Sequence, residues 1–207
     1  MNNNKVFINC PFDNEFFPLL KCLIFTIIYA DLEPQIAETS DSGEARLHKI
    51  VNLMKDSKFS IHDLSRIKPL KRNGLPRFNM PFECGVDFGL KYSNEVEFRE
   101  KIFLILGENR ADYKRFISDI SGNDIKFHNN STEQIIKAIR DWFKTFIKDI
   151  PWHSEIWLAY NEFEYLYESF PSDKGYNPKD INAVTFSDII DFMKPWIAEH
   201  KTSATDS

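Results

Sequence analysis

The stretch KVFINCPFDNEFFPLLKCLIFTIIYADLEPQIA, residues 5–37, decides the class of fold. Residues 5–9 and 34–37 are short, apolar-rich runs of the kind that form buried strands. Residues 14–30 lie between them and carry a helical pattern. A strand, a helix and a second strand in this order predict a parallel pair joined by a right-handed crossover.

The same alternation continues along the chain. Further strands are predicted at 59–62, 101–106 and 125–127, and further helices at 43–56, 79–92 and 132–148. The last of these helices has apolar side chains at helical spacing: Ile135, Ile136, Ile139, Trp142, Phe143 and Phe146. Five strands alternating with helices predict an α/β fold, namely a flavodoxin-like, doubly wound and mostly parallel five-stranded sheet.

Pro151 marks the expected end of a first domain, residues 1–150. Residues 151–207 are predicted to form a C-terminal helical extension, with helices at 155–169 and 186–200. The polar tail, residues 201–207, is expected to be disordered.

Composition excludes several classes of protein. The net charge of -5 and the pI near 5.6 argue against general nucleic-acid binding, which normally needs a basic surface. Three cysteines without zinc-like spacing predict neither a disulfide framework nor structural zinc, and a reducing cytoplasm fits them best. The apolar run 16–32 is interrupted by Pro18 and Lys21, which favours a buried core helix over a membrane span.

The segment NMPFECG, residues 79–85, places one acid, Glu83, in an otherwise apolar helix start. In a parallel sheet Glu83 would lie just past the carboxyl edge, where open α/β folds bind ligands, and the strand ending at His62 would bring Asp63 and Ser65 there. A carboxylate at that edge suits cleavage of an N-glycosidic bond, whose transition state resembles an oxocarbenium ion. The alternative is that Glu83 only stabilises its own helix N-terminus.

Other residues near the same edge could bind a nucleotide. The loop between Asp63 and Glu83 has five cations and no acid, and either holds phosphate or is simply a solvated loop; its cations are Arg66, Lys68, Lys71, Arg72 and Arg77. Asn9 and Phe12 are expected at the mouth of the crevice. Phe12, Phe78 and Phe82 could stack on a base, although packing in the core explains such residues equally well.

Several other motifs carry weaker signals. Residues 38–41 could accept hydrogen bonds from a ribose or cap a helix. Gly85 and Gly89 lie four residues apart on the third helix, where they would let its backbone approach the sheet or a ligand closely. The five histidines have no metal-ligand spacing, and the chain contains neither a Walker loop nor a G-x-G-x-x-G motif. No metal and no cofactor are therefore expected.

Three motifs carry a family resemblance: VFINCPFD at 6–13, HDLS at 62–65 and NMPFECG at 79–85. With them the chain resembles, over roughly residues 5–145, the bacterial TIR-like and nucleoside 2-deoxyribosyltransferase-like proteins. These proteins share a flavodoxin-like fold and cleave N-glycosidic bonds of nucleosides, nucleotides or NAD. The resemblance implies that domain 1–150 is a nucleotide-binding domain of this kind.

The resemblance also implies roles for residues. In the deoxyribosyltransferases the matching glutamate is the nucleophile, which corresponds to Glu83, and the matching aspartate lines the pocket, which corresponds to Asp63. Catalytic TIR domains likewise use one glutamate on the third helix. The usual Asp-x-Gly before the glutamate is replaced here by residues 77–79, which moves the expectation toward a phosphorylated substrate such as NAD. Members of these families often act in bacterial anti-phage defence, as toxic effectors or signal producers.

The sequence thus leads to a cytoplasmic TIR-like N-glycosidase that takes NAD or a related nucleotide as substrate. Glu83 is the expected catalytic residue, and the expected substrate-binding residues are Asn9, Phe12, Asp63, Ser65, Arg66, Arg72, Arg77, Asn79 and Phe82. The alternative is a non-catalytic nucleotide-sensing or assembly subunit of a defence complex. A third hypothesis is an interaction protein whose aromatic-rich extension docks a partner protein. A homo-oligomer is the default expectation.

Overall fold

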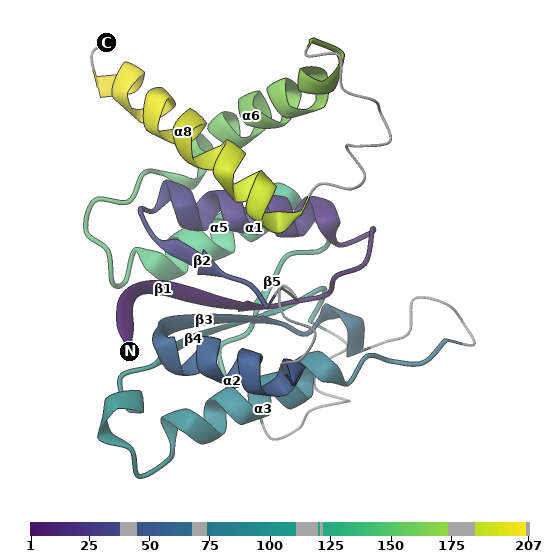
Figure 1. Cartoon of the computed structure of the whole chain (residues 1–207), viewed down its shortest axis with the longest axis vertical. Coiled ribbons are helices and arrows are strands. Elements are labelled where there is room, and N and C mark those ends of the chain that lie inside the picture. Colours follow the sequence, from purple (N-terminus) through teal and green to yellow (C-terminus); the bar gives the residue numbers. More distant parts are fainter. Residues whose placement is uncertain (38–44, 68–73, 111–119, 121, 174–184, 206–207) are drawn as a thin grey trace.

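The fold is a three-layered α/β arrangement with two further helices on one side (Figure 1). The computed structural model describes residues 1–37, 45–67, 74–110, 120, 122–173 and 185–205. Its strands are β1 (Asn2–Asn9), β2 (Glu33–Gln35), β3 (Ser57–Asp63), β4 (Ile102–Gly107) and β5 (Lys126–Phe127). All neighbouring strands pair in parallel, in the order β2-β1-β3-β4-β5. This flavodoxin-like order confirms the predicted fold class.

The helices also follow the sequence pattern. They are α1 (Phe17–Tyr29), α2 (Arg46–Asp56), α3 (Asn79–Lys91), α5 (Thr132–Phe143), α6 (His153–Asp173) and α8 (Phe186–Thr205). Figure 1 shows α1 and α5 on one face of the sheet and α2 and α3 on the other. Helices α6 and α8 lie over α1 and α5, on the side away from the sheet.

Helix α1 is buried nearly all round, which explains its predominantly apolar composition. Eleven of its thirteen residues are buried, because α5 and β2 contact it on one side and α6 and α8 on the other. The ring of Phe25 packs against Tyr160 and Phe163 of α6 and Trp196 of α8. Within the described ranges, no helix has both the length and the apolar character needed to cross a membrane.

The C-terminal tail differs from the expectation of disorder. Helix α8 continues through residues 201–205 instead of ending at 200. The Nζ atom of Lys201 lies 2.8 Å from Oδ1 of Asp31, and the hydroxyl of Thr202 donates to the carbonyl of Ala198. The helix therefore continues through this polar segment, in which the side chains of Lys201 and Thr202 have partners within the protein.

The α2 and α3 face is less apolar than the α1 face. Helix α2 buries Ile50 and Met54, whereas the buried residues of α3 are Met80, Cys84 and Asp87. Gly85 and Gly89 are exposed, and a Cβ atom at either would meet nothing within 4 Å. The expectation that these glycines allow a close approach to the sheet was therefore wrong for the described residues.

Strand β5 is short and pairs only with Leu106 and Gly107 of β4. No described strand pairs with the first four residues of β4 on the side opposite β3. A groove of about 310 Å³ follows this edge between α3 and α5, and its lining includes Phe88, Phe103 and Trp142. The ammonium group of Lys91 donates to the carbonyl of Lys101 at 2.7 Å and lies 5.2 Å from the centre of the Phe103 ring.

Candidate functional site

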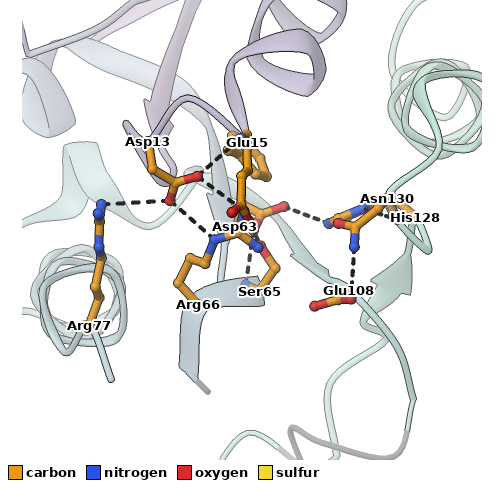
Figure 2. A network of polar contacts seen from close by, with 10 residues as sticks. Asp13, Glu15, Asp63, Ser65, Arg66, Arg77, Glu108, His128 and Asn130 are labelled. Atoms are coloured by element: carbon orange, nitrogen blue, oxygen red, sulfur yellow. Dashed lines mark hydrogen bonds and ion pairs between the residues drawn. The ribbon is translucent and has the colours of Figure 1, made fainter. Parts of the chain in front are cut away.

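The candidate site lies where the direction of strand addition reverses. The chain leaving β1 leads to β2 on one side, whereas the chain leaving β3 leads to β4 on the other. In open α/β sheets the crevice at such a switch point, outside the carboxyl ends of the strands, is the usual ligand site. Figure 2 shows the polar residues that meet there, from the segments that follow β1, β3, β4 and β5.

Asp13 and Arg66 join the loops after β1 and β3. The Arg66 guanidinium is buried and donates from Nε to Oδ2 and from Nη2 to Oδ1 of Asp13, both at 3.1 Å, as a bidentate pair (Figure 2). Burial alone would raise the pKa of Asp13, but the hydrogen bonds and charge of Arg66 outweigh it and lower that pKa. Arg66, expected to bind phosphate, is therefore committed to an internal carboxylate. Asp13 was not among the residues predicted to bind the substrate.

Arg77 is the more accessible cation of this group. Its Nη1 atom lies 3.7 Å from Oδ2 of Asp13, and 47% of its side chain is exposed. Its backbone N–H donates to the carbonyl of Arg66, which fixes the approach to α3. Arg72 lies outside the described residues. Arg77, unlike the buried Arg66, therefore remains accessible to a ligand.

Asp63 and Ser65 come together as predicted, but they face inward. The Asp63 Oδ1 atom accepts hydrogen bonds from both the backbone N–H and the hydroxyl of Ser65. Its Oδ2 atom lies 3.1 Å from Nε2 of His128, whose Nδ1 accepts the backbone N–H of Asn130. Burial opposes ionisation of Asp63, but the interactions with His128 and Ser65 outweigh it and lower its pKa. These contacts fasten the end of β3 to the end of β5.

Asn9 is also turned into the protein. Its side chain is 2% exposed, and its amide nitrogen lies 2.8 Å from the carbonyl oxygen of Met80 and 3.0 Å from Nδ1 of His62. Both amide hydrogens are therefore directed to acceptors within the chain. His62 was expected to pack at a strand end, and its fully buried ring lies between Asn9 and Asp87.

Glu83 differs from these residues because its carboxylate has no close partner in the part of the chain that the structure describes. It is half-buried on α3, and no described residue forms a hydrogen bond or ion pair with it. Burial raises its pKa, and the more distant charge of Arg46 offsets only part of that effect. The pKa of the Cys10 thiol is raised by burial and by the charges of Asp63, Glu83 and Asp13. The Asn9 amide at the end of β1 donates to the carbonyl of Met80, about one helical turn before Glu83, so this part of α3 lies near the carboxyl end of β1.

The aromatic residues expected to stack on a ligand do not gather around Glu83. Phe12 is 43% exposed and makes an edge contact with Phe186 at the start of α8, with 5.7 Å between ring centres. Phe82 is 57% exposed and Phe78 is 70% exposed. Because Met80, Cys84 and Asp87 mark the sheet side of α3, both rings lie on its outer side. Asn79, the first residue of the helix, is exposed.

Metal and thiol chemistry receive no support from the described part of the chain. It contains no group of three His, Cys, Asp or Glu side chains that could hold a metal ion. The cysteines are buried, and burial raises the pKa of Cys84 to about 12, which disfavours a nucleophilic thiolate.

No protein-family model matches the chain, and neither curated proteins nor solved structures gave a match. The fold and the site define an α/β protein of flavodoxin-like topology with a network of polar side chains at its switch point.

Proposed function

We propose that the chain is a TIR-like N-glycosidase that cleaves NAD or a related nucleotide, with Glu83 as its catalytic residue. The observation that carries this proposal is the half-buried Glu83 carboxylate, which has no partner among the described residues and lies at the carboxyl edge of the sheet. The other acids nearby all have cationic or hydrogen-bonding partners; these acids are Asp13, Asp63 and Asp87. In this proposal the Glu83 carboxylate, which is unpaired within the described ranges, faces the reacting group.

The chemistry requires little besides a negative charge at the right place. When the bond between ribose C1′ and the nicotinamide nitrogen breaks, its electron pair goes to the nitrogen, which was already cationic and needs no proton donor. The positive charge that develops on the ribose is stabilised or attacked by Glu83, and water completes the hydrolysis. Partial burial strengthens this electrostatic interaction relative to bulk water.

The surrounding residues support this arrangement in different ways. Arg77 supplies an accessible guanidinium for a phosphate of the substrate. The Asp13–Arg66 pair and the Asp63–His128 pair hold the loops that border the crevice. In this proposal they shape the site and do not contact the reacting atoms.

The direct test is release of nicotinamide from NAD by the pure full-length protein. Glu83→Gln keeps the size of the side chain and removes its charge, and we expect it to lower the rate by roughly 100-fold or more. Glu95→Gln, at an exposed position in the loop that follows α3, serves as the matched control and should leave the rate unchanged. Equal rates for wild type and Glu83→Gln would remove Glu83 from the mechanism.

A second candidate is a nucleotide-sensing or assembly subunit without turnover. It is favoured by the internal use of Asn9, Asp63 and Arg66, which leaves few described polar groups free for a substrate. Saturable binding of NAD by calorimetry, weakened by Arg77→Ala and accompanied by no product on chromatography, would establish this role. Either role is compatible with the proposed place in anti-phage defence and with a homo-oligomer.

A further inference from the structure

A row of buried polar side chains runs between the sheet and α3. It consists of Asn9 on β1, His62 on β3, Asp87 on α3 and Lys101 just before β4, which are each at most 2% exposed. We call these four residues the buried relay. Buried polar groups are costly unless they are satisfied, so a connected row of four in a small apolar interface calls for a structural reason.

One end of the relay is a fully buried ion pair. The Lys101 ammonium lies 3.1 Å from Oδ1 of Asp87 and donates to the carbonyls of Met54 at 2.6 Å and Ser57 at 2.8 Å. These contacts join the last turn of α2, the start of β3 and the middle of α3. Lys101 therefore fixes α3 against two other elements.

The other end of the relay reaches the first turn of α3. The Asp87 carboxylate can only accept, so Nε2 of His62, 3.1 Å from Oδ2, carries the proton and Nδ1 is left as an acceptor. Nδ1 then accepts one N–H of the Asn9 amide at 3.0 Å, and the second N–H goes to the carbonyl of Met80 at 2.8 Å. Each polar group thus specifies the orientation of the next.

The relay contacts α3 at two points, one on each side of Glu83 along the helix. Met80 precedes Glu83 by three residues and Asp87 follows it by four, so both lie about one helical turn away along the same side of the helix. Contacts one turn before and one turn after a residue fix the position of the helix at that residue and the rotation of the helix about its axis.

We propose that the buried relay holds Glu83 at the carboxyl edge of the sheet, and that Asn9 is a positioning residue that acts through the Met80 carbonyl. The inference deepens the proposed function, on which its catalytic consequence rests. It reassigns Asn9, because an amide with both hydrogens used internally cannot also donate to a ribose hydroxyl.

The experiment follows the titration of the Glu83 side-chain carboxyl carbon by NMR in the full chain, with its signal identified by its loss in Glu83→Gln. Asn9→Ala frees the first turn of α3, so the Glu83 carboxylate becomes better hydrated and its pKa falls toward that of an ordinary glutamate. Asn9→Ser, which keeps a shorter donor, should recover part of the wild-type value. Ile139→Val, in the separate apolar core, is the control for general loss of stability and should leave the titration unchanged.

An unchanged Glu83 titration in Asn9→Ala, or an equal change in Ile139→Val, would overturn the proposal. Asn9→Ser decides the question in the same way if Asn9→Ala does not fold. Kinetics provide the second arm: Asn9→Ala should lower kcat for nicotinamide release several-fold more than Ile139→Val does, with KM little changed. If the wild type does not cleave NAD, the proposed function fails, whereas the titration still decides whether the relay positions Glu83.

Discussion

The two faces of the sheet are built on different principles. On the α1 side, apolar residues from the sheet and from α1, α5, α6 and α8 form one continuous cluster. On the α2 and α3 side there are two small apolar clusters and the buried relay, which has an ion pair at one end. The α1 face depends on non-directional burial, whereas the α3 face depends on directional contacts that define where each group lies.

This difference suggests a division of labour between the faces. A thick apolar layer stabilises the chain but does not position any single polar group. The α3 face buries less apolar surface and instead orients the helix that carries Glu83. The proposed chemistry lies on the side where hydrogen bonds, and not apolar packing, set the geometry.

Removal of residues 151–207 should have the largest effect on this comparison. Loss of α6 and α8 would expose the outer side of α1, including Phe25 and its ring contacts, and we expect loss of cooperative unfolding. Circular dichroism melting and size-exclusion chromatography measure this directly, with a chain ending at residue 202 as the control. If the truncated chain melted cooperatively at the wild-type temperature, the two faces would not differ as described.

Lys101→Met should have the next largest effect, on the opposite face. It leaves the Asp87 carboxylate and two carbonyls without their buried cation, and we expect a loss of about 3–5 kcal/mol in the free energy of unfolding. Urea unfolding gives the value. The double variant Lys101→Met/Asp87→Leu should recover part of the loss, since it removes the stranded charge. A loss below about 1 kcal/mol would show that the pair is not structural.

Acid should weaken the α3 face and the site before the α1 core. Burial opposes ionisation of Asp87, but the hydrogen bond with His62 and the charge of Lys101 lower its pKa. The hydrogen bonds with His128 and Ser65 likewise outweigh burial and lower the pKa of Asp63. A carboxyl group whose pKa is lower in the folded state stabilises the fold above its unfolded pKa of about 3.9. That contribution is lost as pH falls through the folded pKa.

Urea midpoints measured from pH 6 to pH 2.5 test this acid sensitivity. When the urea data are converted to free energies of unfolding, the slope of that free energy against pH approaches about 1.4 kcal/mol per pH unit for each proton taken up on unfolding. Asp63→Asn should be less stable at pH 6 but should show a shallower slope. A slope identical to that of the wild type would mean that Asp63 does not contribute.

Glu83→Gln should have the smallest effect on stability, and of opposite sign. Burial raises the pKa of Glu83 in the folded state, so the fold disfavours the ionised carboxylate. The protein therefore loses stability as pH rises from the unfolded pKa of this group to its folded pKa. The neutral amide should therefore stabilise the protein at pH 7 by roughly 0.5–1 kcal/mol. Replacing a functional residue often raises stability at the cost of activity in this way. The gain should vanish near pH 3.5, where both side chains are neutral, and a loss of stability at pH 7 would contradict the assignment.

Much of the fold could be predicted because each element carries its own local pattern. The apolar runs at β1, β3 and β4 and the helical spacing in α5 need no knowledge of the rest of the chain. The mostly apolar run that forms α1, although interrupted by Pro18 and Lys21, correctly indicated a buried core helix. The predicted edge position of Glu83 followed from strand order alone.

The side-chain partners could not be predicted in the same way. Asp13 meets Arg66 across 53 residues, and the pairing depends on two loops whose relative position only the folded sheet determines. The same holds for Asp63 with His128 and for Asp87 with Lys101. One local signal was available: Asp87 lies on the same helix side as Met80 and Cys84, where an acid needs a buried partner.

The short β5 has a consequence for how this protein meets other copies of itself. A strand without a neighbour on one side is a template on which a foreign strand can grow, and natural proteins often guard such edges with lysine. Lys91 stands at the open margin of β4, with its ammonium on the Lys101 carbonyl and above the Phe103 ring. We expect this charged side chain to disfavour pairing of a foreign strand with the part of β4 that has no described neighbour.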